Sequence, residues 1–326
     1  MSDAVRTVHV GLGPIGLRIL NAGIDAGICR PVAAADIAPE IAGKSLHELT
    51  GREDLRDVSV HESLSDGIDS ALEAGANLAV ICTGSSLSHV EGQFAAALER
   101  GLSCISTCEE LVFPWLRSPE VADNLDGIAI ENGAALLGAG VNPGFVLDLL
   151  PYVLTRVCEK ITAVHAGRFV DASRRRQQLQ AKIGCGMTPE QFRALADEGR
   201  IGHVGLAESA ALLADSLGWP WDNFEESIQP VIAETRVSSN HFDVAEGEVR
   251  GQHQRLKMGA VTLELVMALG EDDCDEVRVE GTPPVDAVVR GGIHGDTATA
   301  GAVINFVRPL LNARPGLRTV TDVPLG

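Results

Sequence analysis

The sequence lacks the features that mark membrane, secreted and nucleic-acid-binding proteins. No apolar run reaches the roughly 18 residues that a membrane-spanning helix needs. The chain opens directly on a strand and a glycine turn, without the basic and apolar segments of a secretory signal. Its formal net charge of −19 would repel phosphate backbones. We therefore expect a soluble, cytoplasmic protein that binds neither nucleic acid nor membrane.

The cysteines lack the spacing of a metal site or a disulfide framework. There are seven of them, an odd number, and none forms a Cys-x-x-Cys pair. Cys82, Cys104 and Cys108 lie in or just after apolar strands, where a free cysteine behaves as a small hydrophobic residue. An acidic cluster at 271–276 is predicted to be a solvated hairpin turn. We therefore predict no metal site.

The chain is long enough for two domains, since 326 residues exceed the usual size of a single core. Up to Gly140, short apolar runs alternate with helical segments, which is typical of a parallel sheet covered on both faces. The expected strands are 7–10, 32–35, 58–60, 78–81 and 102–106, and the clearest helices are 14–26 and 85–100. Residues 1–140 are thus predicted to form an α/β Rossmann domain with a doubly wound parallel sheet.

The sequence pattern changes after Gly140. The segments 161–170, 227–238, 242–250 and 256–269 look extended, and the last two show partial apolar alternation. Residues 141–294 are therefore predicted to form an α+β substrate-binding and dimerisation domain on a mixed or antiparallel sheet. Residues 295–311 read as a helix, and the segment 295–326 is expected to pack back near the first domain.

A glycine fingerprint follows the first strand. Gly11-Leu12-Gly13-Pro14-Ile15-Gly16 fits G-x-G-x-x-G between a strand and a helix, which is the context that gives this pattern weight. Gly11 permits the tight turn, Gly13 lets the backbone approach a pyrophosphate, and Gly16 allows close packing of the helix. The pattern predicts a dinucleotide site with the phosphates at the helix N-terminus.

Two further segments are expected to contact the dinucleotide. Asp36 ends the second strand, where a carboxylate accepts hydrogen bonds from the adenosine ribose and opposes a 2′-phosphate. This favours NAD(H), while Lys44 nearby leaves NADP(H) open. Thr83-Gly84-Ser85 follows the fourth strand at the same edge of the sheet, although Ser85 or Ser86 there could equally serve as a simple helix cap.

Two carboxylates follow the fifth strand, in Ser106-Thr107-Cys108-Glu109-Glu110-Leu111. The carboxyl ends of parallel strands meet at one edge, so a side chain here is expected to face the nicotinamide. A partly buried carboxylate with a raised pKa can act as a general acid and base. Glu109 and Glu110 are both candidates.

Four separated motifs resemble the 2,4-diaminopentanoate dehydrogenase and native amine dehydrogenase family, which is related to dihydrodipicolinate reductase by fold. They are the string from Ser106 to Leu111, Gly140-Val141-Asn142-Pro143-Gly144-Phe145, Gly202-His203-Val204-Gly205-Leu206-Ala207-Glu208-Ser209, and Gly295-Asp296-Thr297-Ala298-Thr299-Ala300 with Pro315-Gly316-Leu317. They occur in the expected order, and the similarity covers nearly the whole chain.

The resemblance implies a homodimer that interconverts a small ketone, aldehyde or oxo acid plus ammonia with a primary amine. The catalytic group would be Glu109 or Glu110; related folds place a catalytic lysine one residue after the position of Glu109, which favours Glu110 without deciding the choice. Asn142 and Pro143 would hold the nicotinamide. Phe145, Arg168 and His203 would line the substrate pocket.

Two alternatives remain open from the sequence. A carbonyl or cyclic-imine reductase of the dihydrodipicolinate reductase type would have a paired-histidine and lysine motif, which is missing here. A non-catalytic dinucleotide sensor would not need Glu109 and Glu110 beside a complete fingerprint.

Overall fold

The computed structural model describes residues 4–325, and the chain divides into two compact units. The first unit comprises 1–145 and 294–326, and the second comprises 146–293. The sequence placed the boundary after Gly140, whereas in the structure the first unit continues to Phe145 because residues 140–144 pack on one another and on the C-terminal helix. No helix within residues 4–325 is long and apolar enough to span a bilayer.

The first unit is built on a parallel sheet of seven strands among the described residues, in the order β15-β6-β5-β4-β1-β2-β3. The strand order reverses between β1 and β4, as in a doubly wound dinucleotide-binding domain. The strands are β1 (Val5–Val10), β2 (Cys29–Ala35), β3 (Val60–His61), β4 (Leu78–Ile81), β5 (Ser103–Ser106), β6 (Ala135–Gly138) and β15 (Gly316–Arg318).

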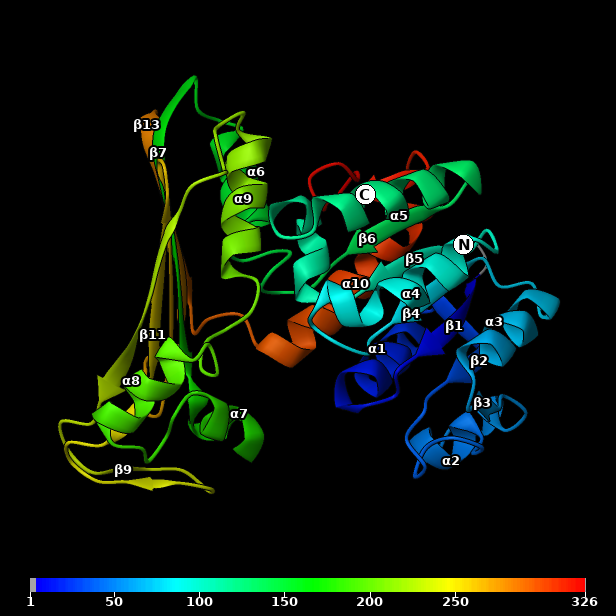
Figure 1. Ribbon diagram of the computed structural model, residues 1–326, viewed down its shortest axis with the longest axis horizontal. Helices are drawn as coiled ribbons and strands as arrows, with labels where there is room; N and C mark the ends of the chain where they lie inside the picture. Colours follow the sequence, from blue (N-terminus) through cyan, green and yellow to red (C-terminus); the bar gives the residue numbers. More distant parts are fainter. Residues whose placement is uncertain (1–3, 326) are drawn as a thin grey trace. The chain divides into compact units, whose positions relative to one another are not determined.

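Helices cover both faces of this sheet. Helices α3, α4 and α5 pack on one face and α1 and α10 on the other, where α10, drawn in orange, runs beside α1 (Figure 1). The short α2 packs near β2 and β3. The helices are α1 (Pro14–Asp25), α2 (Leu46–Thr50), α3 (Leu64–Glu73), α4 (Leu87–Leu98), α5 (Pro119–Glu131) and α10 (Gly295–Leu311). The predicted Rossmann fold is confirmed.

The second unit contains a mixed sheet in the order β14-β13-β7-β12-β11-β8. Among the described residues, β7 and β12 are the only parallel neighbours in this sheet. The other neighbouring strands are antiparallel. The strands are β7 (Lys160–Asp171), β8 (Glu225–Ile232), β11 (Val249–Met258), β12 (Val261–Ala268), β13 (Cys274–Thr282) and β14 (Val285–Arg290), with a separate pair β9 (Val237–Ser238) and β10 (Asp243–Val244).

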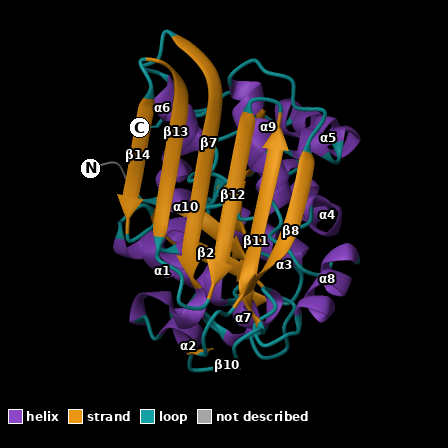
Figure 2. Cartoon of the chain, turned by 90° about the vertical axis from the view of Figure 1, so that its left-hand side faces the viewer, coloured by secondary structure: helices purple, strands orange, loops and turns teal. Residues whose placement is uncertain are grey.

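One face of this second sheet carries helices and the other is open. Helices α6 (Leu149–Thr155), α8 (Pro189–Asp197) and α9 (Leu206–Ser216) contact its strands, while α7 (Gln177–Lys182) follows β7. Figure 2 shows the open face, with α6 and α9 behind it. The predicted α+β second domain on a mixed sheet is confirmed.

Three sequence predictions for this unit are wrong in detail. The segment 256–269 is two strands rather than one, because the chain reverses at Gly259, whose φ is +55°, and β11 pairs with β12. The acidic cluster does not make a hairpin, since β12 and β13 lie on opposite sides of β7 and the connection passes the end of β7. Only Asp243 and Val244 of the expected strand 242–250 are extended before β11 begins.

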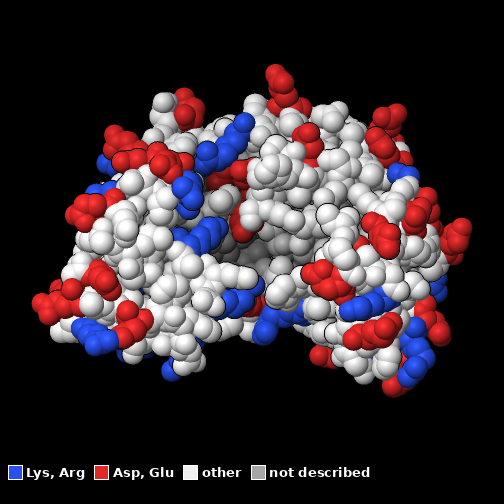
Figure 3. Space-filling view, turned by 60° about the horizontal axis from the view of Figure 1, so that its bottom comes forward, with Lys and Arg blue, Asp and Glu red and all other residues white. Residues whose placement is uncertain are grey.

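The surface reflects the acidic composition. Figure 3 shows acidic side chains spread over the face in view, with basic side chains among them. The charges of the two signs are interspersed, which gives no broad basic surface on this face for a phosphate backbone.

Candidate active site

The carboxyl edge of the first sheet carries the glycine fingerprint. Gly11 has a φ of +83°, and a Cβ at Gly16 would lie 2.0 Å from the Gly11 carbonyl oxygen, so each position needs glycine. A Cβ at Gly13 would meet nothing within 4 Å. Gly13 therefore borders open space at the N-terminus of α1, where a pyrophosphate could approach the backbone.

Asp36 lies directly after β2 at the same edge. Its Oδ2 accepts a hydrogen bond from the Leu12 N–H at 2.6 Å, and its Oδ1 accepts one from the Ala38 N–H at 2.8 Å. The carboxylate is thereby fixed beside the glycine turn. Each oxygen keeps a second lone pair, which could accept a ribose hydroxyl.

The turns after β4 and β5 are joined by Glu110. Its Oε2 accepts hydrogen bonds from the Leu87 N–H at 2.7 Å and from the Ser86 hydroxyl at 3.0 Å, while its own N–H donates to the Ser85 carbonyl. Ser86 occupies the N-cap position of α4 but makes no cap hydrogen bond with its own side chain. Glu110 therefore caps α4, a position where a carboxylate is favourable.

Glu109 begins the 3-10 turn Glu109–Val112 that follows β5, and its side chain is half-buried. Hydrogen bonds tie the start of this turn to the ends of β5 and β4. The Cys108 N–H donates to the Ser106 hydroxyl, which donates to the Ile81 carbonyl. A side chain larger than glycine at Gly138 would collide with Leu111 and Val112. Glu109 thus sits on a backbone that is fixed on two sides.

Cys108 beside these carboxylates is not suited to act as a nucleophile. The pKa of its thiol is raised to about 12, mainly by burial; the charges of Glu109 and Glu110 contribute to the rise, and hydrogen bonds from backbone N–H groups oppose it. Burial likewise raises the pKa of Cys82 to about 12. Both thiols stay protonated at neutral pH, in agreement with the hydrophobic role expected for them.

Asn142 and Pro143 follow β6 at the same edge. The Asn142 Oδ1 is buried and has no hydrogen-bond partner within residues 4–325. The adjacent Val141 N–H donates to the Thr299 hydroxyl of α10 at 3.3 Å. This places an unused acceptor on a fixed backbone, where a donor such as a carboxamide NH₂ would satisfy it. Phe145 is the last residue of this unit before the chain enters the second unit, and it is half-buried.

Arg168 lies on β7 in the second unit and is 5% exposed. Its guanidinium donates to Asp275 Oδ1 at 3.1 Å and to the Ile293 carbonyl at 2.5 Å, and Asp275 Oδ2 accepts from the Ile293 N–H at 2.6 Å. Burial raises the pKa of Asp275, whereas Arg168 lowers it. The pair fixes both backbone polar groups of Ile293, next to the point where the chain returns to the first unit. A contact of Arg168 with substrate stays a prediction.

His203 lies in the loop 201–205 between α8 and α9, also in the second unit. Its Nδ1 is 2.5 Å from the Val204 carbonyl oxygen. Burial lowers its pKa to about 4, with smaller lowering by Lys182 and Arg168 and a raising contribution from the Val204 carbonyl. The imidazole is therefore neutral at physiological pH.

Several buried polar residues of the second unit escaped the sequence analysis. Asp148 accepts a hydrogen bond from the Ser209 hydroxyl at 2.6 Å, which ties α6 to α9. Gln252 and Gln254 alternate on β11 and are 1% and 2% exposed. The period of two along an expected strand could have marked both glutamines as inward-facing. Within 4–325, no three His, Cys, Asp or Glu side chains form a group that could hold a metal.

The comparisons with known proteins assign the chain to a family. Residues 145–326 match the family model described as "2,4-diaminopentanoate dehydrogenase C-terminal domain". The chain belongs to this family. The resemblance noted from the sequence motifs is thus confirmed, and the chain is an oxidoreductase.

Individual relatives agree with this membership. The 2,4-diaminopentanoate dehydrogenase of Acetoanaerobium sticklandii is 28% identical over 99% of this chain and 94% of its own length. An amine dehydrogenase from Mycobacterium smegmatis is 24% identical and superposes with a TM-score of 0.80 over 99% of this chain and 96% of that one. The structure of GenD2 from gentamicin A biosynthesis, in complex with NAD, has a TM-score of 0.55 at 15% identity over 99% and 90% of the two chains. The shared fold is that of nicotinamide-dinucleotide-dependent dehydrogenases.

Proposed function

We propose that the chain is an NAD(P)-dependent amine dehydrogenase, which converts a small ketone, aldehyde or oxo acid and ammonia into a primary amine and catalyses the reverse reaction. The names of the 2,4-diaminopentanoate dehydrogenase and the amine dehydrogenase described above support an amine substrate. The observation that carries the assignment within this chain is the pair of carboxylates after β5: Glu110 caps α4, and Glu109 begins the turn at the carboxyl edge of the sheet.

Glu109 is the acid and base of this proposal. Glu110 is committed to Leu87 and Ser86, so moving its carboxylate would uncap α4. Glu109 starts the same turn at the edge where parallel strands of this fold present ligand-binding groups. Related folds favoured Glu110 in the sequence analysis. We choose Glu109 instead because the Glu110 carboxylate caps α4.

The chemistry assigned to Glu109 is proton transfer. The carboxylate takes a proton from ammonium, so that neutral ammonia adds to the carbonyl carbon, and returns it to the carbinolamine hydroxyl, which leaves as water. The iminium cation that remains is stabilised by the negative carboxylate. The nicotinamide, when bound, supplies the hydride that reduces the iminium carbon.

The dinucleotide fits the residues at this edge. The open space at Gly13 admits the pyrophosphate, Asp36 receives the ribose, and Asn142 Oδ1 accepts from the nicotinamide carboxamide. Thr83, Gly84 and Ser85 lie between them after β4. We propose NAD(H) as the preferred cofactor, because the fixed Asp36 carboxylate would oppose a 2′-phosphate, with NADP(H) binding more weakly.

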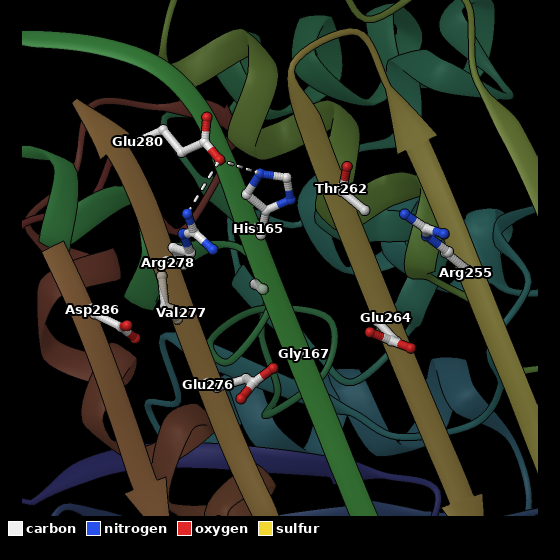
Figure 4. Close-up of a pocket in the computed structure, with 11 residues that line it drawn as sticks. His165, Gly167, Arg255, Thr262, Glu264, Glu276, Val277, Arg278, Glu280 and Asp286 are labelled. Atoms are coloured by element: carbon white, nitrogen blue, oxygen red, sulfur yellow. Dashed lines mark ion pairs between the residues drawn. The ribbon is translucent and has the colours of Figure 1, made fainter. Parts of the chain in front are cut away.

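We also propose a homodimer formed through the open face of the second sheet. The face carries charges of both signs in a hollow of about 420 Å³ (Figure 4). Two ion pairs lie on this sheet: His165 pairs with Glu280 at 3.4 Å and His253 with Glu264 at 2.6 Å. A two-fold axis brings the same surface against itself, so a patch containing both signs can complement its own copy.

The test of the proposed activity is NADH consumption with a panel of short ketones and aldehydes, with and without ammonium at alkaline pH. We expect consumption that requires both the carbonyl compound and ammonium. Consumption that ignores ammonium would replace the proposal by a carbonyl reductase. Retained NADH binding without turnover on any compound would favour a dinucleotide sensor.

A further inference from the structure

A row of register partners crosses the open face of the second sheet from β14 to β8. Each member lies directly opposite the next one on the neighbouring strand. Residues that oppose each other in this way point to the same face of a sheet. We call this set the charged row, and in order across the sheet it consists of Val288, Glu276, Gly167, Glu264, Arg255 and Ser227.

The charges of this row are not matched within the chain. Arg255 lies opposite Glu264 in the register, but the Glu264 Oε1 lies 2.6 Å from the His253 Nε2 instead. Within residues 4–325, Arg255 and Glu276 make no ion pair, and both side chains are exposed. The charged row therefore presents an unpaired cation on β11 and an unpaired anion on β13, with β7 and β12 between them.

The row has a gap at Gly167, which carries no side chain. A Cβ there would lie 2.9 Å from the Phe169 ring and 3.2 Å from the Glu276 Cγ, so a larger residue would push these neighbours aside. Figure 4 shows Glu276 and Glu264 on either side of Gly167, with Arg255 on the next strand. Since Gly167 also lines the hollow of about 420 Å³, there is room at the gap for a side chain that enters from outside.

A two-fold axis that runs along the strands, between β7 and β12, matches the charged row to itself. These are the two central strands of the six, so the axis stacks β13 on β11 of a second copy and β7 on β12. Arg255 then faces Glu276 of the second copy, twice in the dimer, and Glu264 faces the gap at Gly167. An axis along the row would instead set Arg255 against Arg255 and Glu276 against Glu276, which repels.

The row two residues further along β7 agrees with this axis. Phe169 and Val266 are register partners on the two central strands. Phe169 is half-buried within its own chain. The axis between β7 and β12 stacks Phe169 on Val266 of the second copy, so an apolar contact forms at the centre, beside the charged contacts.

The row two residues earlier along β7 is neutral under the same axis. It places Arg278 and Asp286 at one end and Lys257 and Glu225 at the other. Stacking brings Arg278 and Asp286 against Lys257 and Glu225 of the second copy. Each cation then has an anion of the other copy one strand away, and the group of four carries no net charge.

We propose that Arg255 forms an ion pair with Glu276 of a second copy of this chain, and that Glu264 enters the gap over Gly167 of that copy. The inference rests on the proposed homodimer and specifies how its two copies pair. Burial between the sheets removes the solvent that screens an exposed charge, so these two ion pairs select the pairing of the sheets.

The experiment exchanges the charges of the two residues. Arg255→Glu sets carboxylates against each other at both pairs, and Glu276→Arg sets guanidinium groups against each other. We expect either variant alone to dissociate, with the dimer dissociation constant raised at least about 100-fold, or about tenfold for each reversed pair. An equimolar mixture restores unlike charges at both pairs, so we expect a 1:1 heterodimer. Sedimentation velocity measures the masses, and native mass spectrometry with one variant ¹⁵N-labelled identifies the heterodimer.

Arg193 and Glu190 provide a matched control. They form an exposed ion pair at 3.9 Å on α8, which packs on the helix-bearing face of the same sheet. Arg193→Glu and Glu190→Arg make the same charge changes away from the open face, and both should remain dimers. Far-UV circular dichroism should match the wild type in all four variants, because every substituted side chain is exposed.

The outcomes separate the pairing from the dimer itself. A dimeric wild type whose mass neither Arg255→Glu nor Glu276→Arg changes would overturn the pairing and leave the homodimer in place. Dissociated variants that form no heterodimer on mixing would also overturn it, because the two residues would then not face each other. A wild type that is monomeric at every concentration would refute the proposed homodimer, and this inference with it.

Discussion

The buried ion pair between Arg168 and Asp275 allows a quantitative prediction of how much one interaction contributes to the stability of the second unit. Asp275→Asn keeps the shape of the side chain but removes the charge that balances the guanidinium, since the two side chains are 6% and 1% exposed. Removing one partner of a buried pair costs about 3–5 kcal/mol, because the other charge stays buried without compensation. We expect a loss of unfolding free energy of about that size.

The assay is urea unfolding of the wild type and of the Asp275→Asn variant, with Arg56→Met as a control. Arg56 pairs with Glu53 at the surface, so its loss should change the stability by less than about 1 kcal/mol. A double variant, Arg168→Met with Asp275→Leu, should be less destabilised than Asp275→Asn alone if the unpaired charge is the cause. A loss below about 1 kcal/mol in Asp275→Asn would refute the reasoning.

Three further predictions concern other parts of the chain. Burial lowers the pKa of His9 from 6.5 to about 3, so folding favours its neutral form. As the pH falls from 6.5 to about 3, the wild type should lose about 1.4 kcal/mol of stability per pH unit from this group, and His9→Phe should lose less in acid unfolding curves. Gly16→Ala should lower both the melting temperature and the affinity for NADH, measured by NADH fluorescence. Gly13→Ala should lower only the affinity, because its Cβ meets no atom within 4 Å, and equal melting temperatures in the two variants would contradict this. Thr262→Arg on the open sheet face should yield monomers in light scattering, while Asn124→Arg on α5 should leave the dimer, and a monomeric wild type would remove the proposed interface.

The first unit was largely predictable from the sequence because its signals are local. The fingerprint from Gly11 to Gly16 lies between a strand and a helix within a short stretch, and Asp36 follows at the spacing of one βαβ unit. Apolar runs buried on both faces, such as β4 and β5, are recognisable without knowing their neighbours.

The second unit was less predictable because its pattern depends on pairing. β11 and β12 are joined by only two residues, so the segment 256–269 showed one continuous alternation, and Gly259 was the single local sign of the reversal. The position of the acidic cluster beside β7 follows from a strand order that no local signal specifies.

The choice between Glu109 and Glu110 also lay beyond the sequence. Adjacent residues of one type have the same propensity and charge, and only the approach of the β4 turn to the β5 turn gives Glu110 the Leu87 N–H as a partner. Gln254 escaped notice for a similar reason, because its partner is a loop about 50 residues away.

The central claim is that Glu109 transfers the protons while Glu110 caps α4. Its most direct test is the rate of ammonium-dependent NADH oxidation, measured together with NADH affinity, in Glu109→Gln and Glu110→Gln. The account predicts a loss of at least about 100-fold in rate with nearly unchanged affinity for Glu109→Gln, and a smaller loss in rate with a lower melting temperature for Glu110→Gln. A Glu109→Gln enzyme that keeps the wild-type rate would contradict the account.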